Sequence, residues 1–258
     1  MFEVFNRPPA DPVQLPLAVG PWPVILIVTG YLLFVLKLGR LFMANRAPYD
    51  LRAVLKVYNL IQIVYNGTLF LLATFGIFVI RPYDIECIMV LTPDNPFKKV
   101  ERVLAYAYFL NKILDLLDTV FIVLRKNYRQ ASVLHVGHHA AMVLAVYSGL
   151  RFYGYGGHLV LTGYLNVFVH CVMYIYYYIS SQSQSVKQNR WWKQYITIMQ
   201  MLQFLIVIAH SIWTLNQPSC KLSLYPVALV LFMGTVMFIM FSNFYVHTYI
   251  LPKKNKQE

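Results

Sequence analysis

The chain has 258 residues, of which 59% are apolar and 12% charged, and its mean hydropathy is +0.54. Because a soluble domain carries about 25% charged residues, this composition excludes an ordinary soluble enzyme and predicts a membrane protein. The net charge of +12 indicates an anionic membrane face or a polyanionic substrate, and apolar runs along the chain argue against a nucleic-acid partner.

Seven apolar runs follow one another along the chain, and each has about the 20 residues that a transmembrane helix needs. They show no period-2 alternation, which favours helices over barrel strands. We therefore expect one all-α membrane domain with seven transmembrane helices. The expected spans are 22–43, 55–80, 103–124, 132–150, 158–180, 192–214 and 225–250, followed by a basic tail at 251–258.

The distribution of Lys and Arg predicts the orientation of these spans. Seven passes put the termini on opposite sides, and 13 of the 22 Lys and Arg residues fall on the C-terminal side, against seven on the other. This bias predicts a cytosolic C-terminus and a lumenal N-terminus. Cys87 and Cys220 then share a lumenal location, where they either form a disulfide or remain two free thiols.

The third span carries Lys112, Asp115, Asp118 and Thr119, so one of its faces is strongly polar. Ionisable side chains are costly inside a membrane and mark functional positions. The residues either form an internal ion pair that fixes helix packing or line a substrate path.

Three histidines open the fourth span, and His135, His138 and His139 fall within an arc of about 100° on one helix. Imidazoles so placed can bind a metal, transfer protons or supply a nucleophile. Membrane di-iron enzymes use a similar box but need several of them. With only seven His in the chain, we expect no metal site.

Polar residues also form stripes on the fifth and sixth spans. Asn166 and His170 lie one turn apart, where an amide can orient the imidazole or donate to an oxyanion. A hydrogen-bonded seam between helices is the alternative. Other polar side chains on these two stripes are Tyr174, Tyr177, Gln200 and Gln203.

These motifs together resemble the very-long-chain fatty acid elongases. The third span is similar to the family's Lys-x-x-Glu-x-x-Asp-Thr motif, with Asp115 at the position of Glu. The histidine box follows it, and 166–177 resembles Asn-x-x-Val-His-x-x-Met-Tyr-x-Tyr-Tyr. The segment 197–204 is similar to Thr-x-x-Gln-x-x-Gln-Phe.

The resemblance implies that six of the seven helices form a barrel around a closed-ended acyl tunnel in the endoplasmic reticulum membrane. It implies the decarboxylative condensation of malonyl-CoA with long-chain acyl-CoA to 3-oxoacyl-CoA, CoA and CO2, with no metal or redox cofactor. Expected partners are the two substrates, membrane lipid, other elongation-cycle enzymes and a second copy of the chain in a homodimer. Two other classes remain open: a transporter or channel for an anionic lipid-like substrate, and a metal-dependent lipid oxidase.

Site roles follow from this resemblance. His138 is expected to attack the acyl thioester and form an acyl-imidazole, with a one-step transfer as the competing mechanism. The expected catalytic set is His138, His170, His135, His139, Asn166, Lys112, Asp115 and Asp118. The expected substrate-binding set is Thr119, Arg125, Lys126, Arg129, Tyr174, Tyr177, Gln200 and Gln203. Lys254 and Lys256 resemble a dilysine retrieval signal, or are ordinary positive charge on the cytosolic side.

Overall fold

The computed structural model describes residues 8–251, which fold into helices without any β-strand in that range. Three π-helical segments, labelled η, continue longer helices. The elements are α2 (Pro21–Leu33), η1 (Phe34–Leu38), α3 (Gly39–Met43), α4 (Arg52–Thr74), η2 (Phe75–Ile80), α5 (Lys98–Leu114), α6 (Leu116–Leu124), α7 (Val133–Phe152), α8 (Leu159–Gln182), α9 (Gln184–Gln188), α10 (Arg190–Leu215), α11 (Leu224–Tyr245) and η3 (Val246–Ile250).

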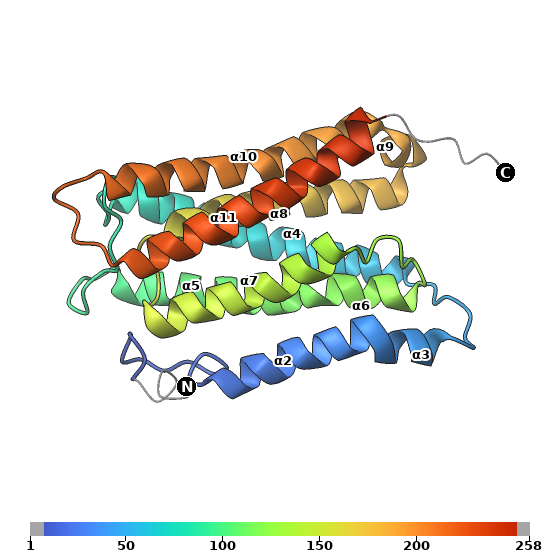
Figure 1. Ribbon diagram of the computed structural model, residues 1–258, viewed down its shortest axis with the longest axis horizontal. Coiled ribbons are helices and arrows are strands. Elements are labelled where there is room, and N and C mark those ends of the chain that lie inside the picture. The colour runs from blue at the N-terminus through green and yellow to red at the C-terminus, as the bar shows by residue number, and fades with distance from the viewer. Residues whose placement is uncertain (1–7, 252–258) are drawn as a thin grey trace.

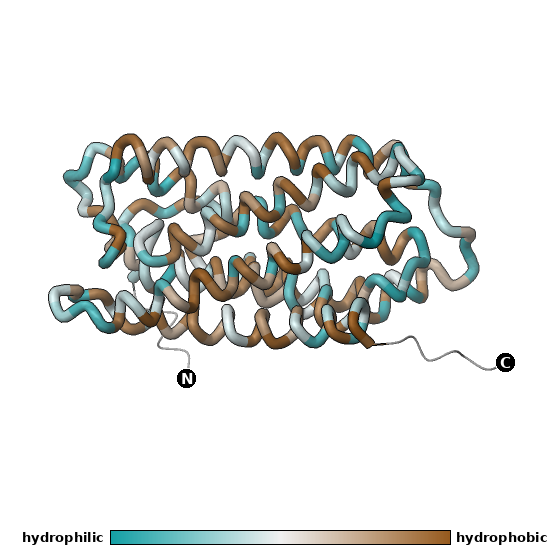
Figure 2. The backbone as a smooth tube through the Cα atoms, turned by 90° about the horizontal axis from the view of Figure 1, so that it is seen from above, coloured by the Kyte–Doolittle hydropathy of each residue, from teal (hydrophilic) through white to brown (hydrophobic). Residues whose placement is uncertain are grey.

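The long helices run back and forth along one axis, so the connecting segments gather at two ends of the molecule (Figure 1). We call one of them the disulfide end; it holds segments 81–97, 153–158 and 216–223. The opposite one, the tail end, holds segments 44–51 and 125–132 and the end of η3. Hydrophilic residues concentrate at both ends, while the helices between them are mostly hydrophobic (Figure 2).

Six helical stretches are long and apolar enough to cross a membrane, where the sequence predicted seven. They are Pro21–Met43, Arg52–Ile80, Val133–Phe152, Leu159–Gln182, Arg190–Leu215 and Leu224–Ile250. The run expected at 103–124 is not among them. There the chain forms α5 and α6, which follow one another along the bundle and are separated at Asp115 (Figure 1). Both pieces are shorter than a span, and the break falls among the buried charges.

Six helical passes contact one another in a closed order. The α4 helix packs against α8, α8 against α10, α10 against α11, α11 against α7, α7 against α5, and α5 against α4. The α2 helix stands outside this order and packs on α7 (Figure 1). Its Tyr31 hydroxyl lies 2.8 Å from the hydroxyl of Thr119 on α6, a buried hydrogen bond that ties α2 to the bundle.

At the disulfide end, Cys87 and Cys220 form a disulfide with their Cα atoms 5.5 Å apart. The segment before α2 folds over the same end, where Asp11 accepts hydrogen bonds from Arg102 and lies 3.5 Å from the Lys98 ammonium. Three segments distant in sequence are thereby held together: the start of the described chain, the connection before α5, and the connection before α11.

Candidate active site

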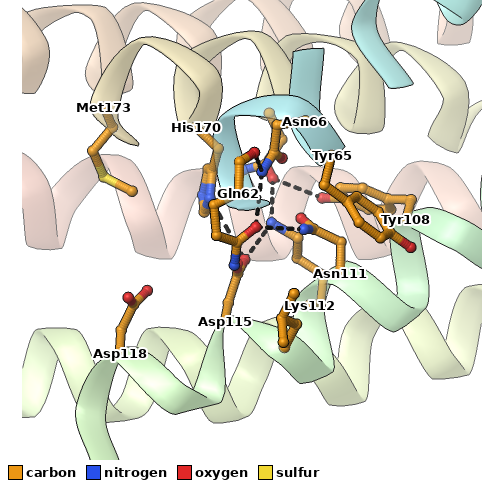
Figure 3. A network of polar contacts seen from close by, with 12 residues as sticks. Gln62, Tyr65, Asn66, Tyr108, Asn111, Lys112, Asp115, Asp118, His170 and Met173 are labelled. Atoms are coloured by element: carbon orange, nitrogen blue, oxygen red, sulfur yellow. Dashed lines mark hydrogen bonds and ion pairs between the residues drawn. The ribbon is translucent and has the colours of Figure 1, made fainter. Parts of the chain in front are cut away.

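The site is centred on Asp115, at the break between α5 and α6. Its Oδ2 atom lies 2.7 Å from Nζ of Lys112 and 3.5 Å from Nδ1 of His170 on α8 (Figure 3). Asp115 and Lys112 are only 2% and 3% exposed. Two unpaired charges at this depth would be strongly unfavourable, so each stabilises the ionised form of the other.

Lys112 also connects the carboxylate to Asn166 on α8. Its Nζ donates to Asn166 Oδ1 at 2.9 Å, and the Tyr108 hydroxyl donates to the same oxygen at 3.1 Å. The ammonium lies 5.1 Å from the centroid of the Tyr108 ring, a cation–π distance. Because the side-chain oxygen of Asn166 already accepts two hydrogen bonds, its NH2 group is the part that remains to act as a donor.

Tyr174 connects the two carboxylates on the α5–α6 pass. Its hydroxyl donates to Asp118 Oδ2 at 2.7 Å and also lies 3.2 Å from Asp115 Oδ1. Tyr174 is fully buried, and its ring packs edge-on against Tyr58 of α4. Asp118 is therefore joined to the site through one phenol rather than by direct contact with Lys112.

The histidine box lies within about the first two turns of α7. Ser132 caps this helix by accepting from the backbone N–H of His135 at 3.2 Å, which fixes where the helix begins. The ring centroids of His135 and His139 are 4.5 Å apart, and those of His138 and His139 are 5.5 Å apart. The three imidazoles thus form one cluster, and His138 also packs against Phe241 of α11.

A large apolar cavity, partly open to the outside, extends between these groups and the disulfide end; its empty space, open solvent included, is about 1350 Å³. Met142 and Asn166 line it, and they lie one helical turn from His138 and His170 respectively. In the other direction the lining continues to Tyr83, Glu101 and Gly156 at the disulfide end. His138 and His170 therefore lie one helical turn beyond these lining residues, at the end of the cavity that faces the tail end.

A hydrogen-bonded group lines the cavity at the disulfide end. Glu101 accepts from the Tyr83 hydroxyl at 2.8 Å, from the Gly157 backbone N–H at 3.1 Å and from Lys98 at 2.8 Å. Burial raises the pKa of Tyr83, so this phenol stays protonated as a donor. Gly156 has φ of +94°, and a Cβ there would collide with the Glu101 carboxylate, so only glycine fits.

The remaining polar residues expected to bind substrate fall into two groups. Gln203 lines the cavity, and its Oε1 has no hydrogen-bond partner; Gln200 lies beside it, with Nε2 3.8 Å from the sulfur of Met173. Tyr177 is 42% exposed and touches the site only through the Tyr174 ring. Thr119 faces α2 rather than the charged cluster.

The basic residues expected to bind substrate lie at the tail end. Arg125 and Arg129 are exposed, and Lys126 has left-handed backbone with φ of +55° and donates to the carbonyl of Ala44 at 3.3 Å. Lys254 and Lys256 lie outside the described residues.

Four residues of the network were not anticipated from the sequence. Gln62 and Asn66 of α4 and Asn111 of α5 are fully buried, and Tyr58 contributes a hydroxyl. Figure 3 shows the three amides between α4 and α5, beside Asp115. The sequence signal was available: Gln62 and Asn66 are amides one turn apart in an apolar run, a costly placement without partners.

Among residues 8–251, no group of three or more His, Cys, Asp or Glu side chains has the spacing to hold a metal ion. The histidine cluster and the carboxylates are instead linked to neighbours by hydrogen bonds and ring contacts. The fold and site define a multi-pass membrane protein with a buried, charge-balanced cluster at the inner boundary of an apolar cavity.

Comparison with known proteins assigns this architecture to a family. Residues 16–257 match the model of the ELO: GNS1/SUR4 family. The chain is 44% identical over 246 residues to very long chain fatty acid elongase F of Drosophila melanogaster, covering 95% of this chain and 96% of the relative. It is 34% identical to human very long chain fatty acid elongase 4 over 93% of this chain and 76% of that protein. The chain belongs to the ELO family.

Proposed function

We propose that this protein is the condensing enzyme of fatty acid elongation, a 3-oxoacyl-CoA synthase that joins malonyl-CoA to a long-chain acyl-CoA. One observation carries the proposal: Asn166, which accepts from the ammonium of the buried Lys112–Asp115 pair, lines a large apolar cavity. His170 and His138 lie one helical turn beyond residues that line it. The cavity suits a fatty acyl chain, and the polar groups suit its thioester. The elongases among its relatives support the same reaction class.

The first half-reaction assigns the acyl group to His138. A ring nitrogen attacks the thioester carbonyl, the C–S bond breaks, and CoA leaves with the proton that the imidazole gives up. The acyl-imidazole would hydrolyse in water, so it needs the dry environment that a buried apolar cavity supplies. His139, whose ring packs beside His138, and His135, whose ring packs beside His139, orient the nucleophile or pass its proton on.

In the second half-reaction malonyl-CoA supplies the carbon nucleophile. Loss of CO2 leaves the bonding pair as an enolate, with negative charge on the thioester oxygen. The NH2 group of Asn166, together with His170, donates to that oxygen. The enolate carbon then attacks the acyl carbonyl, the C–N bond to His138 breaks, and the imidazole takes up a proton. Lys112, Asp115 and Asp118 hold these groups in place.

The tail end is the expected entry for both CoA substrates. CoA carries several phosphate charges, and Arg125, Lys126 and Arg129 present positive charge beside the histidine box. Tyr174, Gln200 and Gln203 would contact the part of the substrate nearest the thioester. Lys254 and Lys256, near the C-terminus of the sequence, would serve retrieval to the endoplasmic reticulum.

This proposal includes the membrane arrangement. The α5–α6 pass is assigned as a seventh span whose charges face inward, and the six passes in closed contact order are assigned as a barrel around the acyl tunnel. The disulfide end is assigned to the lumen of the endoplasmic reticulum, where Cys87 and Cys220 would be oxidised. No metal or redox cofactor enters the reaction, and a homodimer and contacts with other elongation-cycle enzymes stay predictions.

Carboxyl-labelled malonyl-CoA tests the reaction class. Purified protein in lipid vesicles should release labelled CO2 and form 3-oxoacyl-CoA only when acyl-CoA is also present. Release of neither product, or transport of acyl-CoA without its consumption, would reject the proposal in favour of a transporter.

Intact-protein mass spectrometry tests the acyl-imidazole. Incubation with acyl-CoA alone should add one acyl mass to the protein, located to the peptide that contains His138. A protein that turns over both substrates yet never acquires this mass uses the one-step transfer instead.

A further inference from the structure

We infer that Gln62 is a positioning residue for this reaction: it holds the plane of the Asp115 carboxylate, so that one oxygen faces the reacting groups. The inference deepens the proposed function and rests on it. Asp115 has two oxygens with different tasks. Oδ2 faces Lys112 and His170, whereas Oδ1 accepts from Gln62 Nε2 at 2.8 Å (Figure 3).

The orientation of the Gln62 amide follows from its other partners. Asn66 donates from Nδ2 to the backbone carbonyl of Gln62 at 2.9 Å, so this nitrogen must be the donor end of Asn66. The same Nδ2 lies 3.1 Å from Gln62 Oε1, and Asn111 Nδ2 lies 2.8 Å from it. With two donors against its oxygen, Gln62 can present only its NH2 group to Asp115.

The second hydrogen of that NH2 group is also used, because Gln62 Nε2 donates to the Tyr58 hydroxyl at 2.9 Å. All four side-chain hydrogen bonds of Gln62 therefore agree on which atom is the amide nitrogen and which is the oxygen. The assignment starts from the backbone carbonyl of Gln62, which can only accept a hydrogen bond, and leads through Asn66 and Gln62 to the Asp115 carboxylate. Gln62 does not line the cavity, so it acts on substrate through the groups that it holds, and Asp115 is the charged one among them.

Gln62→Glu and Gln62→Met test this role in steady-state condensation assays. A lost hydrogen bond to a charged group predicts that kcat falls about tenfold or more, with KM within about twofold of wild type. In Gln62→Glu the loss should shrink as pH is lowered, because a protonated carboxyl regains an O–H donor toward Asp115. In Gln62→Met the loss should not depend on pH.

Tyr65→Phe is the matched control. The Tyr65 hydroxyl also ties α4 to α5, through the Ala107 carbonyl at 2.9 Å, but it does not touch Asp115. If Gln62 merely joined the two helices, both residues would give the same result. We expect wild-type kcat in Tyr65→Phe. Equal losses in Tyr65→Phe and Gln62→Met, or wild-type kcat in both Gln62 variants, would overturn the inference.

The activity of the wild-type protein and of one further variant distinguishes failure of the proposed function from failure of the Gln62 inference. An inactive wild-type protein would reject the proposed function itself, whereas an active wild type with unaffected Gln62 variants rejects only this inference. Should the Gln62 variants not fold, Asn66→Asp examines the same link from its other end. A carboxylate facing Oε1 forces the Gln62 amide to turn and presents oxygen to Asp115, so a wild-type kcat there would contradict the role.

Discussion

At the scale of single residues, Asp115 balances the buried charge of Lys112 while also facing His170. Asp115→Asn would leave the ammonium uncompensated, which costs about 3–5 kcal/mol of folding stability. Because Lys112 would then lose the carboxylate that holds it beside Asn166, we also expect kcat of the folded variant to fall by roughly 100-fold or more. Asp115→Glu keeps the charge and restores the residue typical of related motifs. Its kcat should stay within about tenfold of wild type, since only one methylene must be accommodated.

Steady-state rates of the two Asp115 variants, compared at equal amounts of folded protein, check this prediction. Equal losses in Asp115→Asn and Asp115→Glu would show that shape, and not charge, matters at this position.

His158 illustrates a histidine outside the site. It lies at the disulfide end, with Nε2 2.9 Å from the Ser211 hydroxyl and its ring stacked on His210. Burial, aided by His210, lowers the pKa of His158 to about 4. A histidine in the unfolded chain has a pKa near 6.5, so between about pH 6.5 and 4 the unfolded state binds a proton that the folded state does not. The free energy of unfolding therefore decreases as pH is lowered through this range.

The melting temperature of wild type should therefore drop further than that of His158→Gln when both are taken from neutral to mildly acidic pH. Parallel melting curves for the two proteins across this pH range would disprove the assignment of a neutral, buried His158.

At the scale of elements, apolar runs predicted where six long helices lie, because length and hydropathy are local properties of the sequence. The third run was harder. The charges that mark the site also lower its hydropathy, and the chain breaks the pass at Asp115, where the backbone N–H of Asp118 bonds to the carbonyl three residues back. Asp115 neutralises Lys112 from three residues along the same pass, a pairing that the sequence offered as one alternative. The other partner of Lys112, Asn166, comes from α8, and no local pattern could reveal it.

The disulfide joins two connections that are 133 residues apart in the sequence. Replacing Cys87 and Cys220 together by Ser should destabilise the fold by about 2–5 kcal/mol, chiefly by releasing the unfolded chain. The site lies away from this end, so kcat at permissive temperature should change little. Cys171→Ser, at a half-buried free thiol, is the control.

Thermal unfolding under non-reducing conditions measures the effect. A double variant that melts with wild type and with Cys171→Ser would show that the disulfide does not stabilise the folded protein.

At the scale of the whole molecule, the cavity is the feature that no single stretch of sequence predicts. Sequence motifs named most of the residues around Asp115, but the cavity exists only because side chains from six passes leave space between them. Its lining at the disulfide end combines Glu101, Tyr83 and Gly156, from three separate segments. Such a combination has no signature in one local stretch, and the same holds for the amides of α4 and α5.

The depth of the cavity predicts a change in acyl-chain preference. Ala145 lines the cavity about 10 Å along α7 from His138, so Ala145→Phe should block its deeper half and shift turnover toward shorter acyl-CoA substrates. Its neighbour Leu144 is 42% exposed on the outer face, and Leu144→Phe should leave the preference unchanged. Product profiles over a ladder of acyl-CoA lengths decide between them; identical profiles would mean that the acyl chain lies elsewhere.

The rate of 3-oxoacyl-CoA formation in a matched pair of histidine variants tests the central claim most directly. His138→Gln changes the proposed nucleophile, and His158→Gln changes a buried histidine at the opposite end of the same bundle. We predict a loss of roughly 1,000-fold or more in His138→Gln and a near wild-type rate in His158→Gln. If His138→Gln keeps its rate while correctly folded, the cluster beside Asp115 is not where the acyl group is transferred.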